Sequence, residues 1–321
     1  MEYVELGRTG VKVSVAALGC GGHSKLGQCQ GASIESSIGV VHAATDLGIN
    51  IIDTSDTANM EMIVGRAIKD RRDSVLIASK LHTDRKDGSR IDAEILRTYV
   101  EGALTRLHTD VIDIFYLHGV LPEDYQYCVK ELVPELDRLR ERGLIRFMGA
   151  TESWTFHADS NHEMLAQAVQ DDCWDVLMAG FNLLNHSANR VVFPKAIEKG
   201  IGIFAMYAVR DLLSRPELLK SAIQEAINEG VMDSSTIDAS NPLGFLVHEG
   251  GATSVVDAAY RFARHEPGVS AVLTGTGNIE HLRENVKSIS RGPLPANDRE
   301  RLVALFGHLT HFTGNYVASV A

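Results

Sequence analysis

The sequence predicts one domain over residues 1–321, an α/β protein of the (β/α)8 TIM-barrel class with an N-terminal β-hairpin plug. Two observations predict this fold: eight short apolar runs follow one another along the chain, and segments with helical periodicity lie between them. A length of 321 residues is sufficient for one such barrel. An open dinucleotide-binding sheet is less favoured, because the glycine-rich turn at 19–24 lacks the third glycine that such a sheet requires.

The eight predicted strands are too short to be buried helices, and most are rich in Val or Ile and end in a polar or glycine-containing turn. They cover residues 15–18, 51–53, 75–79, 112–117, 145–150, 176–179, 201–206 and 271–274. Between them, apolar residues at 96–107 and 129–139 recur at helical spacing and predict helices with one stripe against the sheet. Ahead of the first strand, segments 3–6 and 11–13 flank a glycine-containing turn and predict the hairpin. The stretch 210–251 exceeds one strand–helix unit, so we expect an additional helix there.

The composition excludes several classes of protein. Acidic residues outnumber basic ones by 42 to 31, and the resulting charge of −11 argues against a nucleic-acid partner. No apolar run approaches the roughly 20 residues that span a bilayer, and the N-terminus lacks the basic and apolar regions of a secretory signal. The four cysteines show no paired spacing, which argues against a disulfide framework. We therefore expect a cytoplasmic protein whose partner is a small-molecule substrate.

Three chemically distinct side chains follow successive predicted strands. Asp53 ends the second strand, Lys80 follows the third and His118 follows the fourth. Barrel enzymes keep their reactive groups at the carboxyl ends of the strands, so we expect these three side chains to converge. A lysine beside a carboxylate keeps its charge and can polarise a carbonyl or hydroxyl group. Each residue alone could be an ordinary polar group at a strand end, but the three together favour a catalytic site.

A second signal follows the eighth strand. The small residues Gly275, Thr276 and Gly277 and then Asn278 precede an amphipathic helix. A phosphate can approach such a backbone, where the amides at the start of the helix supply donors and partial positive charge. The alternative is a glycine-rich turn in which Asn278 is a plain N-cap.

Several motifs together resemble the aldo-keto reductase family over nearly the whole chain. They are LGRTGVKVS at 6–14, GINIIDT at 48–54, IASK at 77–80, DIFYLH at 113–118, GLIRFMG at 143–149 and GTGNIEHLREN at 275–285. The run ELVPELDRLRERGLIRFMGATE at 131–152 is most similar to the branch of sugar 1-dehydrogenases. The resemblance implies a nicotinamide enzyme, usually with NADP and otherwise with NAD, that moves hydride to or from a carbonyl carbon.

The resemblance also implies roles for individual residues. The family's catalytic Asp, Lys and His match Asp53, Lys80 and His118, whereas Ala58 stands where the family has its proton-donating tyrosine. Alanine has no proton to donate, so we expect a non-standard donor. At the nicotinamide, the expected residues are Thr151 and Glu152 in place of a Ser-Asn pair that holds the amide, Met178 in place of a Gln, and Met206 or Tyr207 in place of the stacked aromatic. At the other end of the cofactor, the expected residues are Gly275, Thr276, Gly277 and Asn278 at the phosphates, His281 at the 2′-phosphate, and Glu284 and Asn285 at the adenine.

The sequence leaves three functions open. The first is an NAD(P)-dependent oxidoreductase for a carbonyl or sugar-type substrate, in which His118, Tyr116, Tyr125 or Tyr127 replaces the missing donor. The second is a repurposed barrel that acts as a lyase or epimerase. The third is a non-catalytic NADP-binding protein. No spacing of histidines and carboxylates matches a known metal site, so no metal ion is predicted.

Overall fold

Eight parallel strands form a closed barrel in the computed structural model, which describes residues 1–22, 24–55, 57, 59–85, 87–154, 159–310 and 312–315. Around the barrel the strands follow the order β10-β3-β4-β5-β6-β7-β8-β9, so each strand pairs with the next in the chain. The strands are β3 (Ala16–Gly19), β4 (Ile51–Asp53), β5 (Leu76–His82), β6 (Ile112–Val120), β7 (Ile145–Glu152), β8 (Val176–Gly180), β9 (Gly202–Met206) and β10 (Val269–Thr274). All eight predicted strands are present, and the predicted TIM barrel is confirmed.

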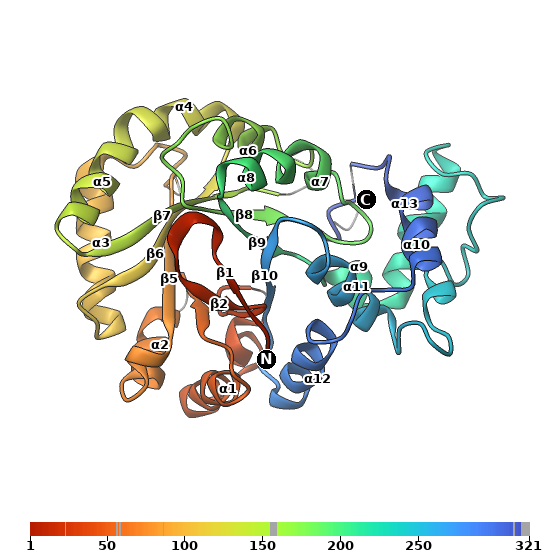
Figure 1. The fold of residues 1–321 in the computed structure, drawn as a ribbon, viewed down its shortest axis with the longest axis horizontal. Coiled ribbons are helices and arrows are strands. Elements are labelled where there is room, and N and C mark those ends of the chain that lie inside the picture. Colours follow the sequence, from red (N-terminus) through yellow and green to blue (C-terminus); the bar gives the residue numbers. More distant parts are fainter. Residues whose placement is uncertain are drawn as a thin grey trace.

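The N-terminal hairpin pairs β1 (Tyr3–Glu5) with β2 (Lys12–Ser14) in antiparallel register and lies across one end of the barrel (Figure 1). Its apolar side chains Leu6 and Val13 are fully buried and belong to the core inside the barrel. The turn approaches β9 closely, because a Cβ on Gly202 would lie 2.5 Å from Leu6 Cδ1. The hairpin is therefore the plug that the sequence predicts.

Leu6 is the apolar anchor of this plug, and its removal is expected to destabilise the protein. Leu6→Ala leaves a cavity that the rigid barrel end cannot close, and we expect the free energy of unfolding to fall by about 3 kcal/mol. Chemical denaturation measures this change. Lys12→Ala, at an exposed position of the same hairpin, is the control and is expected to change stability by less than about 0.5 kcal/mol. Equal effects of the two substitutions would contradict a plugging role.

Helices surround the barrel (Figure 1). They are α1 (Ile34–Asp46), α2 (Met60–Ile68), α3 (Ala93–Leu107), α4 (Tyr125–Tyr127), α5 (Val133–Glu141), α6 (Glu163–Ala168), α7 (Ala188–Val191), α8 (Phe193–Lys199), α9 (Asp211–Ser214), α10 (Pro216–Asn228), α11 (Val255–Arg264), α12 (Ile279–Ile289) and α13 (Ala296–Phe306). The predicted helix at 96–107 lies within α3, which begins where the side chain of Asp92 accepts a hydrogen bond from the amide of Ile95. The predicted helix at 129–139 differs in form: it starts as a π-helical turn at Cys128–Leu132 and continues as α5. In the described part of the chain, no helix has the length and apolar character to cross a bilayer.

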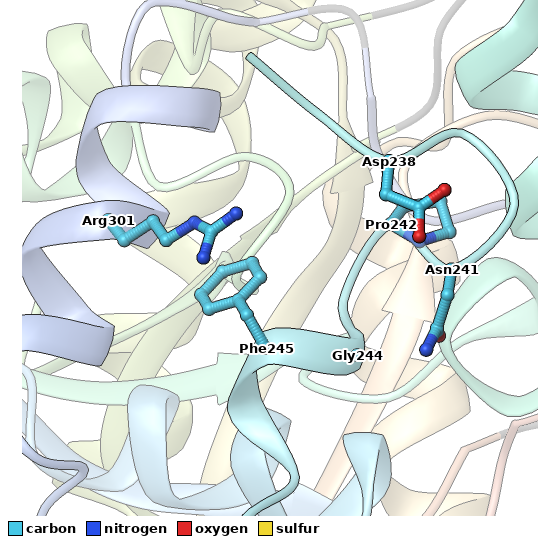
Figure 2. A pocket seen from close by; sticks show the side chains of 6 residues that line it. All are labelled: Asp238, Asn241, Pro242, Gly244, Phe245 and Arg301. Atoms are coloured by element: carbon cyan, nitrogen blue, oxygen red, sulfur yellow. The ribbon is translucent and has the colours of Figure 1, made fainter.

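The additional helix expected within 210–251 is α10, preceded by the short α9. This segment and α13 lie at one side of the barrel (Figure 1), and Arg301 of α13 contacts Phe245 of the segment. A hollow of about 180 Å³ lies in this region, and its lining comes from residues 238–245 and from Arg301 of α13 (Figure 2). The Arg301 guanidinium lies over the ring of Phe245, 4.2 Å from its centroid. None of the residues that line this hollow stands at a strand end, so it is separate from the site described next.

A separate apolar cluster fills the barrel interior, because alternate strand residues point inward while their neighbours pack against the helices. We call this set the interior cluster: Leu6, Val13, Ala17, Ile51, Ala78, Ile114, Tyr116, Trp154, Val176, Met178, Phe204, Met206 and Ala271. The register of neighbouring strands shows that polar residues also occupy inward-facing positions. Lys80 of β5 is the partner of Tyr116 of β6, and His82 is the partner of His118.

Candidate active site

Asp53 and Lys80 form an ion pair at the carboxyl ends of β4 and β5. Lys80 Nζ donates to Asp53 Oδ1 at 2.6 Å and to Oδ2 at 2.5 Å, and to the carbonyl of Thr54 at 2.9 Å. These three bonds use all three ammonium protons. Both residues are buried. Burial raises the pKa of Asp53 above its ordinary value, and the charge of Lys80 opposes that change.

His118 lies beside this pair on β6, and its ring contacts that of His82 in a tilted arrangement, with the two ring centroids 3.9 Å apart. Burial lowers the pKa of His118 well below its ordinary 6.5, and the charges of Lys80 and His82 lower it further. The imidazole is therefore neutral near pH 7. Its Nδ1 is buried and has no hydrogen-bond partner among the described residues. A neutral imidazole can orient a ligand by a hydrogen bond, but it carries no additional proton to donate.

Buried polar atoms without partners gather at this end of the barrel. Within the described residues they include Thr54 Oγ1, Tyr116 Oη, His118 Nδ1 and Trp154 Nε1. Buried polar groups in native proteins nearly always have hydrogen-bond partners. Thr54, His118 and Trp154 lie at or just after the carboxyl ends of β4, β6 and β7, and Tyr116 lies two positions before His118. The four atoms therefore fit a site for a polar ligand. The hydroxyl groups of the other two candidate tyrosines do have partners. Tyr125 Oη bonds to Asp171 and Trp174, and Tyr127 Oη donates to the carbonyl of Ile91.

Glu152 forms a buried pair with His162 that the sequence analysis did not foresee. Its carboxylate oxygens lie 2.9 and 3.0 Å from His162 Nδ1, and Oε1 accepts the amide of Gly180 at 2.7 Å. Both side chains are inaccessible to solvent. Burial raises the pKa of Glu152, and the neighbouring His162 acts in the opposite direction. The carboxylate expected at the nicotinamide amide is thus already engaged by two donors of the protein.

Trp154 covers the end of β8 beside this pair. A Cβ on Gly180 would lie 1.9 Å from Trp154 Cδ2, so glycine alone allows the indole to lie there. The indole stacks on His162 and on Tyr207, with centroid distances of 5.6 and 5.9 Å. The Arg210 guanidinium lies over the Tyr207 ring, 3.9 Å from its centroid. Tyr207 is partly exposed and has a φ of 64°. It is the aromatic residue at the position where the resemblance implies stacking on the nicotinamide.

The other residues expected near the nicotinamide are buried around the same opening. Met178 and Met206 belong to the interior cluster. Thr151 is buried, and its hydroxyl accepts the amide of Gly119 at 2.8 Å. Its own hydroxyl proton remains available to a ligand. The nicotinamide end therefore offers Thr151 and Tyr207 to a ligand, whereas Glu152 is committed within the protein.

The expected phosphate end is open to solvent at several positions. Gly275, Asn278, His281 and Glu284 are exposed, and they flank the first turns of α12. Asn278 Oδ1 accepts the amides of Glu280 and His281, so this residue is also the N-cap that the alternative interpretation predicted. The helix start still supplies partial positive charge to an anion.

Two details of this segment concern packing rather than a ligand. A Cβ on Gly277 would lie 2.3 Å from Gly27 Cα, which explains that glycine by the close approach of two loops. Asn285 Nδ2 donates to Thr274 Oγ1 at 2.9 Å and thus ties α12 to β10. The exposed residues of the segment fit the phosphates of a dinucleotide, and the buried ones hold the turn in place.

Comparison with known proteins identifies the family. The sequence model of the Aldo/keto reductase family matches residues 17–306, and this chain therefore belongs to the aldo/keto reductase family. It is 26% identical over 316 residues to the uncharacterized oxidoreductase YqkF of Bacillus subtilis (strain 168), with 96% of each chain covered. It is 24% identical over 314 residues to L-galactose dehydrogenase of Arabidopsis thaliana, covering 94% of this chain and 92% of that protein. The fold is similar to the holo form of aldo-keto reductase AKR11C1 from Bacillus halodurans, with a TM-score of 0.72, 22% identity, and 95% and 96% of the two chains covered.

Family membership confirms the resemblance found in the sequence. The assignment to the sugar dehydrogenase branch stays a prediction. So does the alignment of Ala58 with the family's tyrosine, since Ala58 lies outside the described residues.

Proposed function

We propose that this protein is an NAD(P)(H)-dependent oxidoreductase that acts on a carbonyl or sugar-type substrate and uses a non-standard proton donor. The observation that carries the proposal is the buried Asp53–Lys80 ion pair beside a neutral His118, at the ends of three successive strands. The name of one relative, L-galactose dehydrogenase, supports a sugar-type substrate. NADP is the preferred cofactor and NAD the alternative.

Each group has a role that follows from its geometry. A bound nicotinamide supplies or accepts the hydride. The exposed residues Gly275, Asn278 and His281 hold its phosphates, with Tyr207 at the nicotinamide end. Lys80 keeps a positive charge at the barrel mouth because Asp53 holds it there, and this charge stabilises negative charge that develops on a substrate oxygen. His118, neutral and with a buried nitrogen to spare, orients that oxygen.

One observation favours a second function, an NADP-binding protein without turnover. Glu152 stands where the family holds the nicotinamide amide, and its carboxylate is engaged by His162 and Gly180 instead. A cofactor held mainly by its phosphates would bind without a fixed nicotinamide.

Ligand binding and turnover distinguish the two functions. Purified protein is titrated with NADPH and with NADH while nucleotide fluorescence is recorded, and a panel of aldehydes and aldoses is then added. Binding followed by oxidation of the nucleotide supports the oxidoreductase. Binding without turnover on any carbonyl supports the second function, and absence of binding contradicts both.

The proposed role of His118 predicts a pH profile. Because burial holds its pKa well below 6.5, kcat/KM is expected to stay level as pH decreases past 6.5 and to fall only in more acidic solution. The free energy of unfolding also falls as pH drops below about 6.5, because the unfolded histidine takes up a proton that the native one does not. Steady-state rates and denaturation between pH 4 and 8 test both statements, with His118→Gln as the control that removes this titration. An acid limb centred at or above pH 6.5 would contradict the assignment.

We also propose a cytoplasmic location. The four cysteines Cys20, Cys29, Cys128 and Cys173 are free thiols, as in a reducing compartment.

A further inference from the structure

Tyr116 is a buried tyrosine whose hydroxyl the fold does not use. It lies inside the barrel on β6, in register with Lys80 of β5 and Gly149 of β7. The residue is inaccessible to solvent, and its Oη has no hydrogen-bond partner among the described residues. Burial raises the pKa of Tyr116 well above 10, and the negative charge of Asp53 adds to this effect, so the two groups share one electrostatic environment. The hydroxyl therefore keeps its proton at the level of the Asp53–Lys80 pair.

The neighbouring strand makes room for this ring. A Cβ on Gly149 would lie 2.3 Å from Tyr116 Cδ1 and 2.7 Å from the carbonyl oxygen of Val176, so glycine is required opposite the ring. Phenylalanine would fill the same space without a polar atom. A buried hydroxyl without a partner destabilises a fold. Nothing in the packing explains why position 116 carries the hydroxyl.

Neither Lys80 nor His118 supplies a free proton to a substrate. All three protons of Lys80 are donated to Asp53 and to the carbonyl of Thr54. His118 is neutral, and Ala58 has no proton to give. The hydroxyl of Thr54 and the indole of Trp154 are much weaker acids than a phenol. Among the described residues, Tyr116 is thus the phenol inside the barrel whose proton is uncommitted.

We propose that the Tyr116 hydroxyl is the proton donor to the substrate oxygen, in place of the tyrosine that the family has at the position of Ala58. This assignment rests on the proposed oxidoreductase function. In the direction of reduction, the carbonyl carbon receives a hydride from reduced nicotinamide, and the π electrons of the carbonyl move to its oxygen. That oxygen forms a bond to the Tyr116 proton as the phenolic O–H bond breaks. An alkoxide is a stronger base than a phenolate and can therefore take this proton, and the phenolate regains a proton from water that enters the site after the product leaves.

Two Tyr→Phe variants test the assignment, because one is expected to lose activity but not stability and the other to lose stability but not activity. Tyr116→Phe is expected to lower kcat at least 100-fold, as for loss of a general acid, while its Tm equals or exceeds that of the wild type. Tyr99→Phe is the matched control: Tyr99 lies on α3 outside the barrel, and its hydroxyl donates to Glu61 at 2.9 Å. This variant is expected to keep kcat within twofold and to lose Tm.

The outcomes separate the two levels of the proposal. A Tyr116→Phe variant with wild-type kcat overturns the assignment of Tyr116 and leaves the oxidoreductase intact. A Tyr116→Phe variant that loses Tm as Tyr99→Phe does shows a structural hydroxyl and also overturns the assignment. A wild-type protein without turnover on any carbonyl of the panel overturns the proposed function, and the assignment with it.

Discussion

Lys80→Met is expected to abolish turnover and to destabilise the protein at neutral pH. Methionine matches the aliphatic part of the lysine side chain but removes the ammonium group, whose charge stabilises a developing alkoxide. It also leaves Asp53 buried without its cation, which lowers the free energy of unfolding by about 3 kcal/mol. Steady-state assays and chemical denaturation at pH 7 measure the two effects. The loss of stability is expected to be smaller in acid, where Asp53 takes up a proton.

A double variant separates the two consequences. Asp53→Asn combined with Lys80→Met removes both charges, so stability is expected to recover toward that of the wild type while turnover stays absent. Full activity in Lys80→Met would exclude a catalytic role for the ammonium group. Recovered activity in the double variant would show that the ammonium group is not needed for turnover and that Lys80→Met acts only by leaving Asp53 buried without its cation.

Glu152→Ala is expected to produce the largest loss of stability among the variants considered. It leaves His162 Nδ1 and the amide of Gly180 buried without an acceptor, and we expect the free energy of unfolding to fall by about 4 kcal/mol. The Trp154 indole rests on this pair, so the fluorescence of the tryptophans is also expected to change. Thermal and chemical denaturation measure the first effect, and emission spectra measure the second.

Glu152→Gln is the matched control for this prediction. The amide oxygen of glutamine can still accept the Gly180 amide, so the loss of stability is expected to be less than half as large. NADPH affinity is expected to stay unchanged in this variant, because Glu152 is committed within the protein. A large loss of affinity without a loss of stability would instead place Glu152 at the cofactor, as the family resemblance implies.

The strands and their ends were predictable because their signals are local. Asp53, Lys80 and His118 each follow a short apolar run, and the barrel rule brings such ends together without knowledge of the register. The hairpin was predictable for the same reason, since apolar segments flank a turn with Gly7 and Gly10. These features depend on residues that are near in sequence.

The features that escaped prediction depend on contacts between distant residues. Trp154 lies on Gly180, 26 positions further along the chain, and nothing in either segment alone indicates this contact. The pairing of Glu152 with His162 joins residues ten positions apart, and the backbone of His162 is left-handed. The space for the Tyr116 ring becomes visible only when the register places Gly149 beside it. The local signal of such a close approach is a glycine that lies within a strand and away from any turn.

The N-terminal plug has a kinetic consequence. Because Leu6 and Val13 fill one end of the barrel, we expect a molecule to reach the depth of Tyr116 through the opposite end. Two molecules that share one route must associate in sequence, the deeper one first, and must depart in the reverse sequence. We therefore expect an ordered mechanism rather than a random one.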